Sequence, residues 1–178
     1  MRFKHVALLG FSCVSLSVTA SGSDGWELLS DLGAYGLVGA ALATPAYKED
    51  WQGFRQAAYS VATASAVGLV GKVTIDAERP DKSGNDSFPS NHTANAFASA
   101  TTLNIRYGWR AGLPAYGVAT LVGIGRVQAD KHYWKDVAAG AAIGSLSGWL
   151  LTDKLDENVQ LTPWATTKGA GVSVTYVW

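Results

Sequence analysis

The sequence predicts an all-α helical bundle that ends in a small C-terminal β-hairpin. Five stretches have helical length, and four of them are mainly apolar. Hydrophobic residues make up 48% of the 178 residues, which suffices for one buried core. The last residues alternate between apolar and polar side chains, as half-buried strands do. We therefore expect one domain over residues 21–178.

Residues 1–20 have the features of a secretory signal peptide. Arg2 and Lys4 precede a mostly apolar run over 6–18, and small residues at 18–20 fit a signal-peptidase cleavage site. The run is shorter than the roughly twenty apolar residues that cross a bilayer. We expect cleavage and export, to the periplasm or beyond. An integral membrane protein whose site faces the periplasm is the alternative.

The predicted helices span residues 31–46, 56–72, 93–105, 111–126 and 137–151. Their interiors are rich in small residues, and Gly140, Gly144 and Gly148 form a stripe at four-residue spacing. Such a stripe allows a neighbouring helix to approach closely. Because the apolar runs are only about fifteen residues long, they favour a soluble or membrane-peripheral bundle over a membrane-spanning one.

A polar connection over residues 73–91 contains too many helix breakers to be helical throughout. Loops of this length in compact domains are usually functional. Near the end of the chain, residues 159–164 and 171–178 are strand-like, and we expect the resulting hairpin to pack on the bundle as a small sheet. Four tryptophans fit either core positions, which are more common for isolated aromatics, or membrane-interface anchors: Trp51, Trp109, Trp134 and Trp149.

Composition excludes several classes of function. The chain carries 14 basic and 14 acidic residues, so it lacks the positive charge typical of proteins that bind nucleic acid. One cysteine and three histidines exclude a disulfide framework and a finger-type zinc site. Any chemistry must therefore use histidine, carboxylates, hydroxyls and cations.

Three polar clusters interrupt the small-residue background. They consist of Lys72 with Arg79-Pro80, then Pro89-Ser90-Asn91-His92, then Arg126 with His132 and Asp136. Three cations, two imidazoles, a hydroxyl and a carboxylate are suited to holding and attacking a phosphoryl group. Each cation also has an ordinary interpretation, since Lys72 ends a predicted helix and the two arginines could be paired or exposed.

The second cluster fits the start of a helix. Ser90 is a favourable N-cap, and the free amides of the first turn would attract an anion beside His92. Taken alone, this cluster is better explained as an ordinary capped helix with a surface histidine, because serine caps are common.

The third cluster places His132 four residues before Asp136. On a helix the two side chains share one face, and the carboxylate could accept the imidazole Nδ1 proton, which would leave Nε2 free as a nucleophile. Alternatively, Asp136 caps the helix over 137–151 and His132 is a partly buried polar side chain.

Together the three clusters resemble the signature of the type 2 phosphatidic acid phosphatase (PAP2) superfamily, which includes bacterial class A acid phosphatases and vanadium haloperoxidases. The resemblance covers residues 72–136 and implies a PAP2-like helical bundle. Two positions depart from the usual pattern. Asn91 replaces a glycine and adds bulk beside the anion, whereas Gly125 replaces a serine and removes a hydroxyl.

The resemblance implies a phosphatase that hydrolyses phosphomonoesters without a metal or other cofactor. It assigns His132 as the nucleophile that forms a phosphohistidine, Asp136 as its orienting carboxylate and His92 as the acid for the leaving oxygen. The groups implied to hold the phosphoryl oxygens are Lys72, Arg79, Ser90, Asn91 and Arg126.

The substrate class stays open at this point. A soluble body would favour small phosphorylated molecules, whereas contact with a membrane surface would favour lipid phosphates such as phosphatidate or an isoprenoid pyrophosphate. A non-catalytic exported bundle that binds phosphate or lipid is the alternative from a different class, and a vanadium-dependent haloperoxidase is a weaker one because the chain is short. The resemblance also allows a homo-oligomer.

Overall fold

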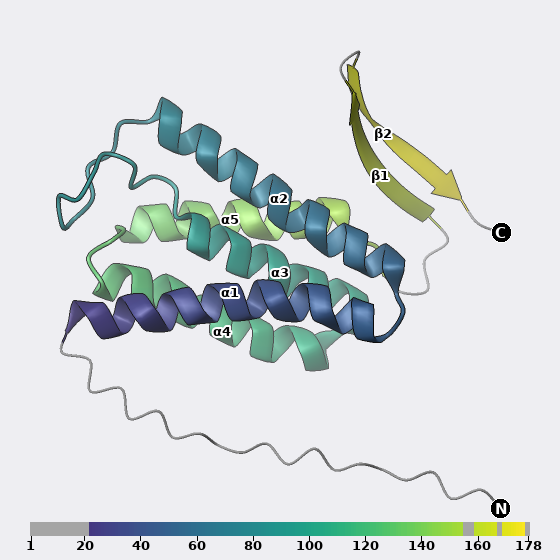
Figure 1. The fold of residues 1–178 in the computed structure, drawn as a ribbon, viewed down its shortest axis with the longest axis horizontal. Helices are drawn as coiled ribbons and strands as arrows, with labels where there is room; N and C mark the ends of the chain where they lie inside the picture. Colours follow the sequence, from purple (N-terminus) through teal and green to yellow (C-terminus); the bar gives the residue numbers. More distant parts are fainter. Residues whose placement is uncertain (1–21, 155–158, 167–168, 177–178) are drawn as a thin grey trace, which may run out of the picture.

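Five helices form the body of the computed structural model, which describes residues 22–154, 159–166 and 169–176 (Figure 1). The predicted signal segment lies outside the described residues. The helices are α1 (Ser23–Tyr47), α2 (Trp51–Thr74), α3 (Asn91–Tyr107), α4 (Trp109–Gln128) and α5 (Trp134–Leu151). The predicted all-helical bundle is confirmed, although each helix begins earlier than predicted.

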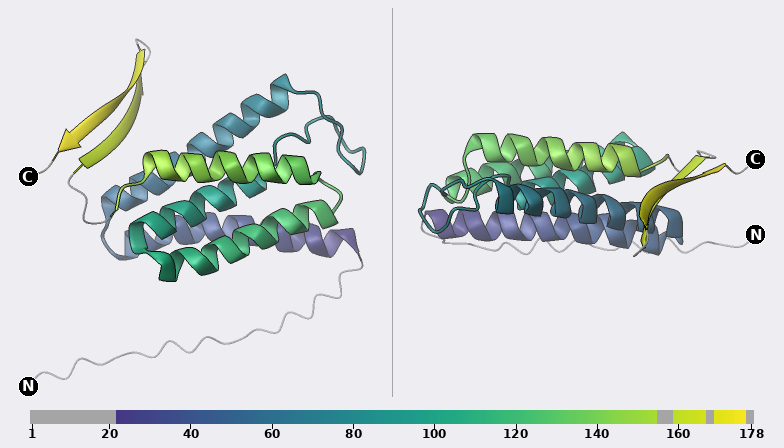
Figure 2. Two further views of the ribbon diagram at one scale, coloured as in Figure 1. Left: turned by 180° about the vertical axis from the view of Figure 1, so that it is seen from behind. Right: turned by 90° about the horizontal axis from the view of Figure 1, so that it is seen from above.

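Helix α3 lies at the centre of the bundle. It contacts each of the other four helices, and Figures 1 and 2 show it between them. Its side chains there are small: Ala94, Ala96, Ala98 and Ala100 are fully buried. Since alanine adds little bulk, the helices around α3 pack with their backbones close together.

The glycine stripe of α5 faces α3, as close packing requires. A Cβ atom on Gly144 would lie 2.1 Å from the Ala94 carbonyl oxygen, and one on Gly140 would lie 2.4 Å from the Ser90 carbonyl oxygen. On Gly148 the nearest atom, Thr101 Cβ, would be 2.6 Å away. The stripe therefore fixes α5 against α3, and α5 begins beside the second and third polar clusters.

We expect Gly144→Ala to destabilise the protein. The added methyl group meets backbone atoms of α3, so the two helices must separate, at a cost of about 1–3 kcal/mol. Gly39→Ala in α1 is the matched control, because a Cβ atom there meets nothing within 4 Å. In a helix interior that change should stabilise by about 0.5–1 kcal/mol. Denaturant unfolding of both variants checks the expectation, and equal effects would contradict it.

Large apolar side chains lie mainly on the outside of the bundle. On α1, α2, α4 and α5 the exposed ones include Leu28, Leu29, Leu32, Val67, Leu69, Val70, Val73, Leu113, Leu121, Leu146 and Leu150. The four tryptophans considered above, Trp51, Trp109, Trp134 and Trp149, are 59–66% exposed, so the core positions named as the more common alternative are wrong for them. Within the described residues, none of the helices combines the length and hydropathy needed to cross a membrane.

A buried ionic cluster stabilises the end of the bundle at which α1 and α3 end and α2 begins. The Arg106 guanidinium, whose side chain is 2% exposed, donates from Nε to Asp50 Oδ2 over 2.7 Å. It also donates to the main-chain carbonyls of Asp153 and Lys154, and the Tyr107 hydroxyl donates to the same Asp50 oxygen. This cluster joins the α1–α2 turn, the end of α3 and the segment that follows α5.

Two strands, β1 (Val159–Thr166) and β2 (Gly169–Tyr176), follow the bundle and pair in antiparallel register. Trp164 lies opposite Gly171 and packs over it. Val172 and Val174 are 59% and 67% exposed. The prediction that this apolar face packs on the helices was therefore wrong. Figures 1 and 2 show the strand pair projecting beyond the end of the bundle at which α2 begins.

Candidate active site

The three predicted clusters meet at one end of the bundle, where α2 and α4 end and α3 and α5 begin (Figure 1). Main-chain hydrogen bonds connect them. The Ser90 amide donates to the Asp136 carbonyl over 3.1 Å, and the Asp81 amide donates to the Asp130 carbonyl over 3.0 Å. The loop that carries Arg79 is thus attached to the loop that carries His132.

His132 is the most deeply placed imidazole of the site. It lies in the loop between α4 and α5, its amide donates to the Arg126 carbonyl, and its side chain is 2% exposed. Its Nδ1 atom is 3.8 Å from Asp136 Oδ2, beyond hydrogen-bond distance. The two residues are neighbours as predicted, but the expectation that they share a helical face was wrong because α5 begins at Trp134.

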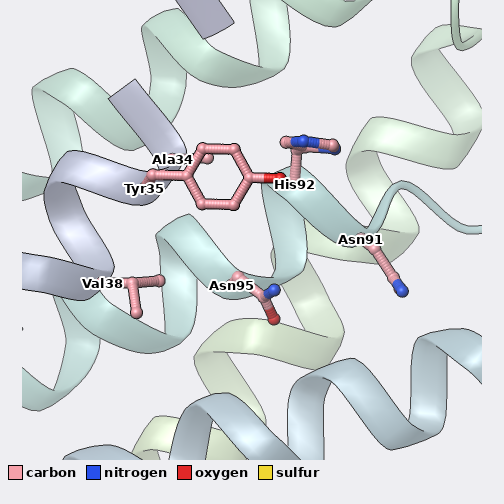
Figure 3. Close-up of a pocket in the computed structure, with 6 residues that line it drawn as sticks. All are labelled: Ala34, Tyr35, Val38, Asn91, His92 and Asn95. Carbon is pink, nitrogen blue, oxygen red and sulfur yellow. The ribbon is translucent and has the colours of Figure 1, made fainter. Parts of the chain in front are cut away.

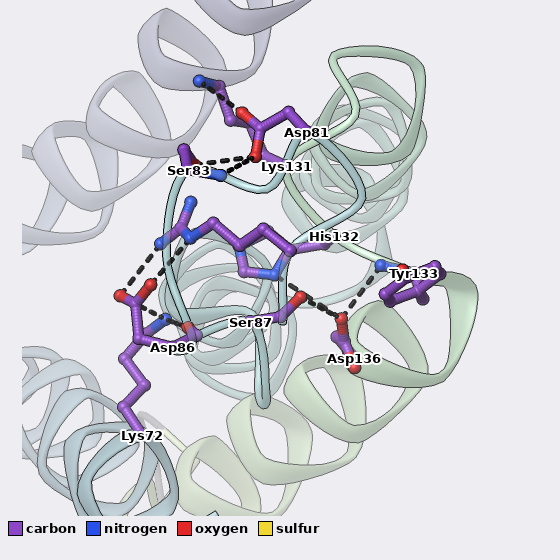
Figure 4. Close-up of polar contacts among 10 residues, drawn as sticks. Lys72, Asp81, Ser83, Asp86, Ser87, Lys131, His132, Tyr133 and Asp136 are labelled. Carbon is purple, nitrogen blue, oxygen red and sulfur yellow. Dashed lines mark hydrogen bonds and ion pairs between the residues drawn. The ribbon is translucent and has the colours of Figure 1, made fainter. Parts of the chain in front are cut away.

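Asp136 holds the start of α5 and the preceding loop in place (Figure 4). Its Oδ2 atom accepts hydrogen bonds from the Ser87 hydroxyl at 2.6 Å and the Tyr133 amide at 2.9 Å. Tyr133 is the N-cap and Asp136 the third residue of the helix, an arrangement that forms a capping box. The predicted cap at Asp136 itself is therefore wrong by three residues, although the carboxylate does stabilise the helix start.

Ser87 was not singled out from the sequence. Its side chain is fully buried, and its hydroxyl makes a shorter hydrogen bond to the Asp136 carboxylate than the Tyr133 amide does. Serine in a polar loop is common, so no local pattern distinguished Ser87 from Ser83. Only the packing of the loop against α5 identifies it as part of the site.

The surroundings of His132 keep its imidazole neutral. Burial is the main cause, followed by the positive charges of Arg126, Lys72 and Arg79, and together they lower the pKa of His132 from 6.5 to about 3. A neutral imidazole retains the lone pair that a nucleophile needs.

The same pKa predicts how stability depends on pH. The folded chain resists protonation of His132 down to about pH 3, whereas the unfolded chain takes up that proton near its ordinary pKa of 6.5. The unfolded state therefore binds more protons between these values, and stability should fall as the pH decreases from about 6.5 towards 3. Thermal unfolding at several pH values should show a weaker dependence in His132→Gln, and an unchanged dependence would contradict this assignment.

Lys72 and Arg79 are paired with one acidic residue, Asp86. Arg79 binds this carboxylate through Nε at 2.7 Å and Nη2 at 3.0 Å, while Lys72 Nζ lies 3.5 Å from Asp86 Oδ2 and donates to the Asp86 carbonyl. The Arg79 hydrogen bond holds the pKa of Asp86 well below its usual range. Both predicted cations are thus present at the site, but their donors face Asp86.

Arg126 and His92 meet at Asp31, a residue of α1. Arg126 Nη1 is 2.8 Å and His92 Nε2 is 3.2 Å from the same oxygen, Asp31 Oδ1. His92 also contacts the Tyr35 ring edge-on, with 5.8 Å between ring centroids. Figure 3 shows His92 and Tyr35 at a pocket of about 190 Å³ between α1 and α3, which Ala34, Val38, Asn91 and Asn95 also line.

Ser90 and Asn91 lie at the start of α3 as predicted, but their side chains make other contacts than expected. Ser90 occupies the N-cap position, but its hydroxyl pairs with the Thr93 hydroxyl at 3.0 Å and makes no capping hydrogen bond. The Asn91 side chain packs against Gly68 of α2, where a Cβ atom would lie 1.7 Å from Asn91 Oδ1. Gly68 thus makes room for the bulk that Asn91 adds.

Gly125 allows close packing of two helices, which its description as the loss of a serine hydroxyl did not predict. A Cβ atom at this position would lie 2.9 Å from Ser30 Cβ and 3.1 Å from the Trp26 carbonyl oxygen. Helix α4 can approach α1 this closely only because residue 125 has no side chain. A serine there would push away the helix that carries Asp31.

The part of the chain that forms this site matches a known protein family. The model of the PAP2 superfamily matches residues 53–160, which include all three clusters. The chain belongs to the PAP2 superfamily. Among the described residues of this PAP2 protein, no group of three or more histidine, cysteine or carboxylate side chains is placed to hold a metal ion.

Curated relatives of this PAP2 protein include two enzymes named for lipid A. The chain is 42% identical over 83 residues to the lipid A 1-phosphatase of Porphyromonas gingivalis, covering 45% of this chain and 19% of the relative. It is 33% identical over 78 residues to the lipid A 4'-phosphatase of Helicobacter pylori, covering 44% and 39%. Lipid phosphate phosphatase 1 of Arabidopsis thaliana is 37% identical over 81 residues, covering 36% and 24%. The matches thus span about a fifth to two fifths of these relatives.

Two crystal structures share the fold of this PAP2 protein. LpxE of Aquifex aeolicus matches with a TM-score of 0.62 and 22% identity, covering 72% of this chain and 83% of that chain. A transmembrane PAP2-type phosphatidylglycerolphosphate phosphatase of Bacillus subtilis matches with a TM-score of 0.59 and 24% identity, covering 72% and 74%. These likenesses confirm the predicted PAP2-like bundle.

Proposed function

We propose that this PAP2 protein is a phosphatase that hydrolyses lipid phosphates through a phosphohistidine intermediate. The observation that carries the proposal is the position of His132, a buried imidazole kept neutral beside Asp136 and close to the charges of Arg126, Lys72 and Arg79. Those cations would draw a phosphate into the site and oppose its charge through the transition state.

In the first step, His132 attacks phosphorus with the ring nitrogen remote from Asp136. A bond forms between this nitrogen and phosphorus while the bond from phosphorus to the leaving oxygen breaks. The imidazole becomes positively charged, and the Asp136 carboxylate, 3.8 Å from Nδ1, stabilises that charge. Ser87 and the Tyr133 amide keep the carboxylate in position.

His92 serves as the acid and then as the base. Its Nε2 proton passes to the leaving oxygen, which departs as an alcohol. In the second step, neutral His92 takes a proton from water as the water oxygen attacks phosphorus and the bond to His132 breaks. Inorganic phosphate leaves, and both imidazoles return to their initial states.

The phosphoryl oxygens would lie among Lys72, Arg79 and Arg126. In this assignment a phosphoryl oxygen replaces the Asp86 carboxylate at the two Arg79 donors, which already present the bidentate geometry that phosphate accepts. The Ser90 hydroxyl and the Asn91 amide, at the start of α3, complete the proposed phosphate contacts.

Lipid substrates and contact with a membrane surface are supported by the surface of the bundle. Trp26 and Trp134 are exposed where α1 and α5 begin, at the site end, and Trp51, Trp109 and Trp149 are exposed at the other end. Exposed leucines and valines lie between these two groups. Tryptophan at both edges of an apolar band is typical of proteins that contact bilayers. The names of the curated relatives support the same substrate class.

A direct comparison of substrates tests the proposed function. Residues 21–178 are assayed with a chelator present against phosphatidate in mixed micelles, lipid A and p-nitrophenyl phosphate. We expect release of inorganic phosphate, fastest from a lipid substrate. Preference for the small ester would contradict the lipid assignment, and loss of all activity on adding the chelator would contradict the metal-free mechanism. No hydrolysis of any substrate by a folded chain that binds phosphate would favour the non-catalytic binding module.

A further inference from the structure

Asp31 lies in the third turn of α1, outside the three clusters and outside residues 53–160 that the family model matches. One of its oxygens, Oδ1, accepts from Arg126 Nη1 at 2.8 Å and is 3.2 Å from His92 Nε2. A single carboxylate oxygen therefore connects α1 to the proposed acid on α3 and to a proposed phosphate-binding cation on α4.

The packing of α1 on α4 fixes the position of this carboxylate. Ser30, the preceding residue, is fully buried against Gly125, and its hydroxyl donates to the Glu27 carbonyl at 2.8 Å. Arg126 Nη1 also lies 3.4 Å from the Ser30 hydroxyl. The Arg126 side chain is 5% exposed and that of Asp31 is 35% exposed, so the carboxylate has room to turn towards solvent while the guanidinium does not.

The charges that face His92 have opposite effects on its protonation. Burial lowers the pKa of His92, and so do the positive charges of Arg126 from α4, Lys72 from α2 and Arg79 from the loop. Asp31 from α1 raises it. A residue that must donate a proton at the leaving oxygen has to be protonated when substrate binds, and Asp31 is placed to favour that form.

We propose that Asp31 is a positioning residue that holds protonated His92 and the Arg126 guanidinium on one oxygen until the phosphoryl group and leaving oxygen of the substrate take its place. This inference rests on the proposed function. His92 Nε2 carries one proton, so the leaving oxygen and Asp31 cannot both accept it. A carboxylate and a phosphate at Arg126 also repel each other, so binding of phosphate must turn Asp31 away.

The variant Asp31→Asn tests the proposal, because it removes the charge and keeps the shape. We expect three changes relative to wild type: a lower His92 pKa by NMR titration, a severalfold lower Kd for inorganic phosphate by calorimetry, and a shift of the alkaline limb of the activity profile to lower pH. The limb shifts in that direction because protonated His92 is needed and its proton is lost earlier. Asp31→Glu should move the alkaline limb of the activity profile part of the way back towards its wild-type pH.

Asp24→Asn is the matched control, since Asp24 is an exposed carboxylate at the start of the same helix. It should leave all three quantities unchanged. A folded Asp31→Asn variant with an unaltered His92 pKa, or with weaker phosphate binding, would overturn the proposal. If that variant does not fold, the wild-type chain is titrated with inorganic phosphate and followed by NMR. Displacement of Asp31 by phosphate must shift the His92 resonance, so a resonance that does not shift would exclude the displacement. These measurements need no turnover, so a folded but inactive wild type counts separately, against the proposed function.

Discussion

Replacing His132 with alanine is expected to reduce turnover by at least about 10⁴-fold. Without the imidazole no phosphohistidine can form, and the remaining cations only bind the phosphoryl group. The His132 Nδ1 atom lies 3.8 Å from Asp136 Oδ2, so the substitution breaks no hydrogen bond to that carboxylate. Steady-state assay with the preferred phosphate ester gives the measurement.

Phosphate binding provides the control for this variant. Lys72, Arg79 and Arg126 remain in place in His132→Ala, so inorganic phosphate should still bind with a Kd close to that of the wild type. A variant that retains turnover within tenfold of wild type would exclude His132 as the nucleophile. Loss of phosphate binding together with turnover would mean instead that the substitution has disrupted the site.

Replacing Asp50 with alanine is expected to cost about 3–5 kcal/mol of folding free energy, the largest effect on stability that we predict. The change leaves the Arg106 guanidinium, 2% exposed, without its carboxylate partner at the far end of the bundle. It also removes the acceptor of the Tyr107 hydroxyl, whose pKa is raised mainly by burial and then by the hydrogen bond to Asp50. Denaturant unfolding measures the loss.

Two further variants make the Asp50 result specific. Asp50→Ala combined with Arg106→Met removes both charges and should recover part of the lost stability, because no unpaired buried charge remains. Asp24→Ala, an exposed acid on α1, should change stability by less than about 0.5 kcal/mol. If Asp50→Ala is no more harmful than Asp24→Ala, the cluster around Arg106 does not stabilise the bundle as described.

The sequence predicted all five helices, but each begins two to eight residues before its predicted start. Helix α1 begins at Ser23 rather than at residue 31. Its first two turns mix Trp26, Leu28 and Leu29 with polar residues, so no continuous apolar run marked them as helical. Glu27 in that part is paired with Lys131, which lies next to His132 in the chain. A contact with a distant loop supports these turns, and no local periodicity records such a contact.

The clusters were predicted from residue type and order, whereas their partners were not. Asp31, Asp86 and Ser87 are ordinary polar residues in the sequence, yet each binds a predicted site residue in the structure. Their positions depend on how α1, the loop after α2 and the start of α5 pack. The i,i+4 spacing of His132 and Asp136 suggested that both residues lie on one helix. In the structure Tyr133 is the N-cap of α5, so His132 lies in the loop before the helix and Asp136 lies in its first turn.

Isolation of the covalent intermediate decides whether His132 is the nucleophile. The chain is mixed with a ³²P-labelled phosphate ester, denatured within one turnover at alkaline pH, and digested for mass spectrometry. We expect an acid-labile, base-stable phosphoryl group on the peptide that contains His132, and none on the corresponding peptide of His132→Ala. Label on another residue, or rapid hydrolysis by the wild type with no labelled peptide under conditions that preserve phosphohistidine, would contradict it.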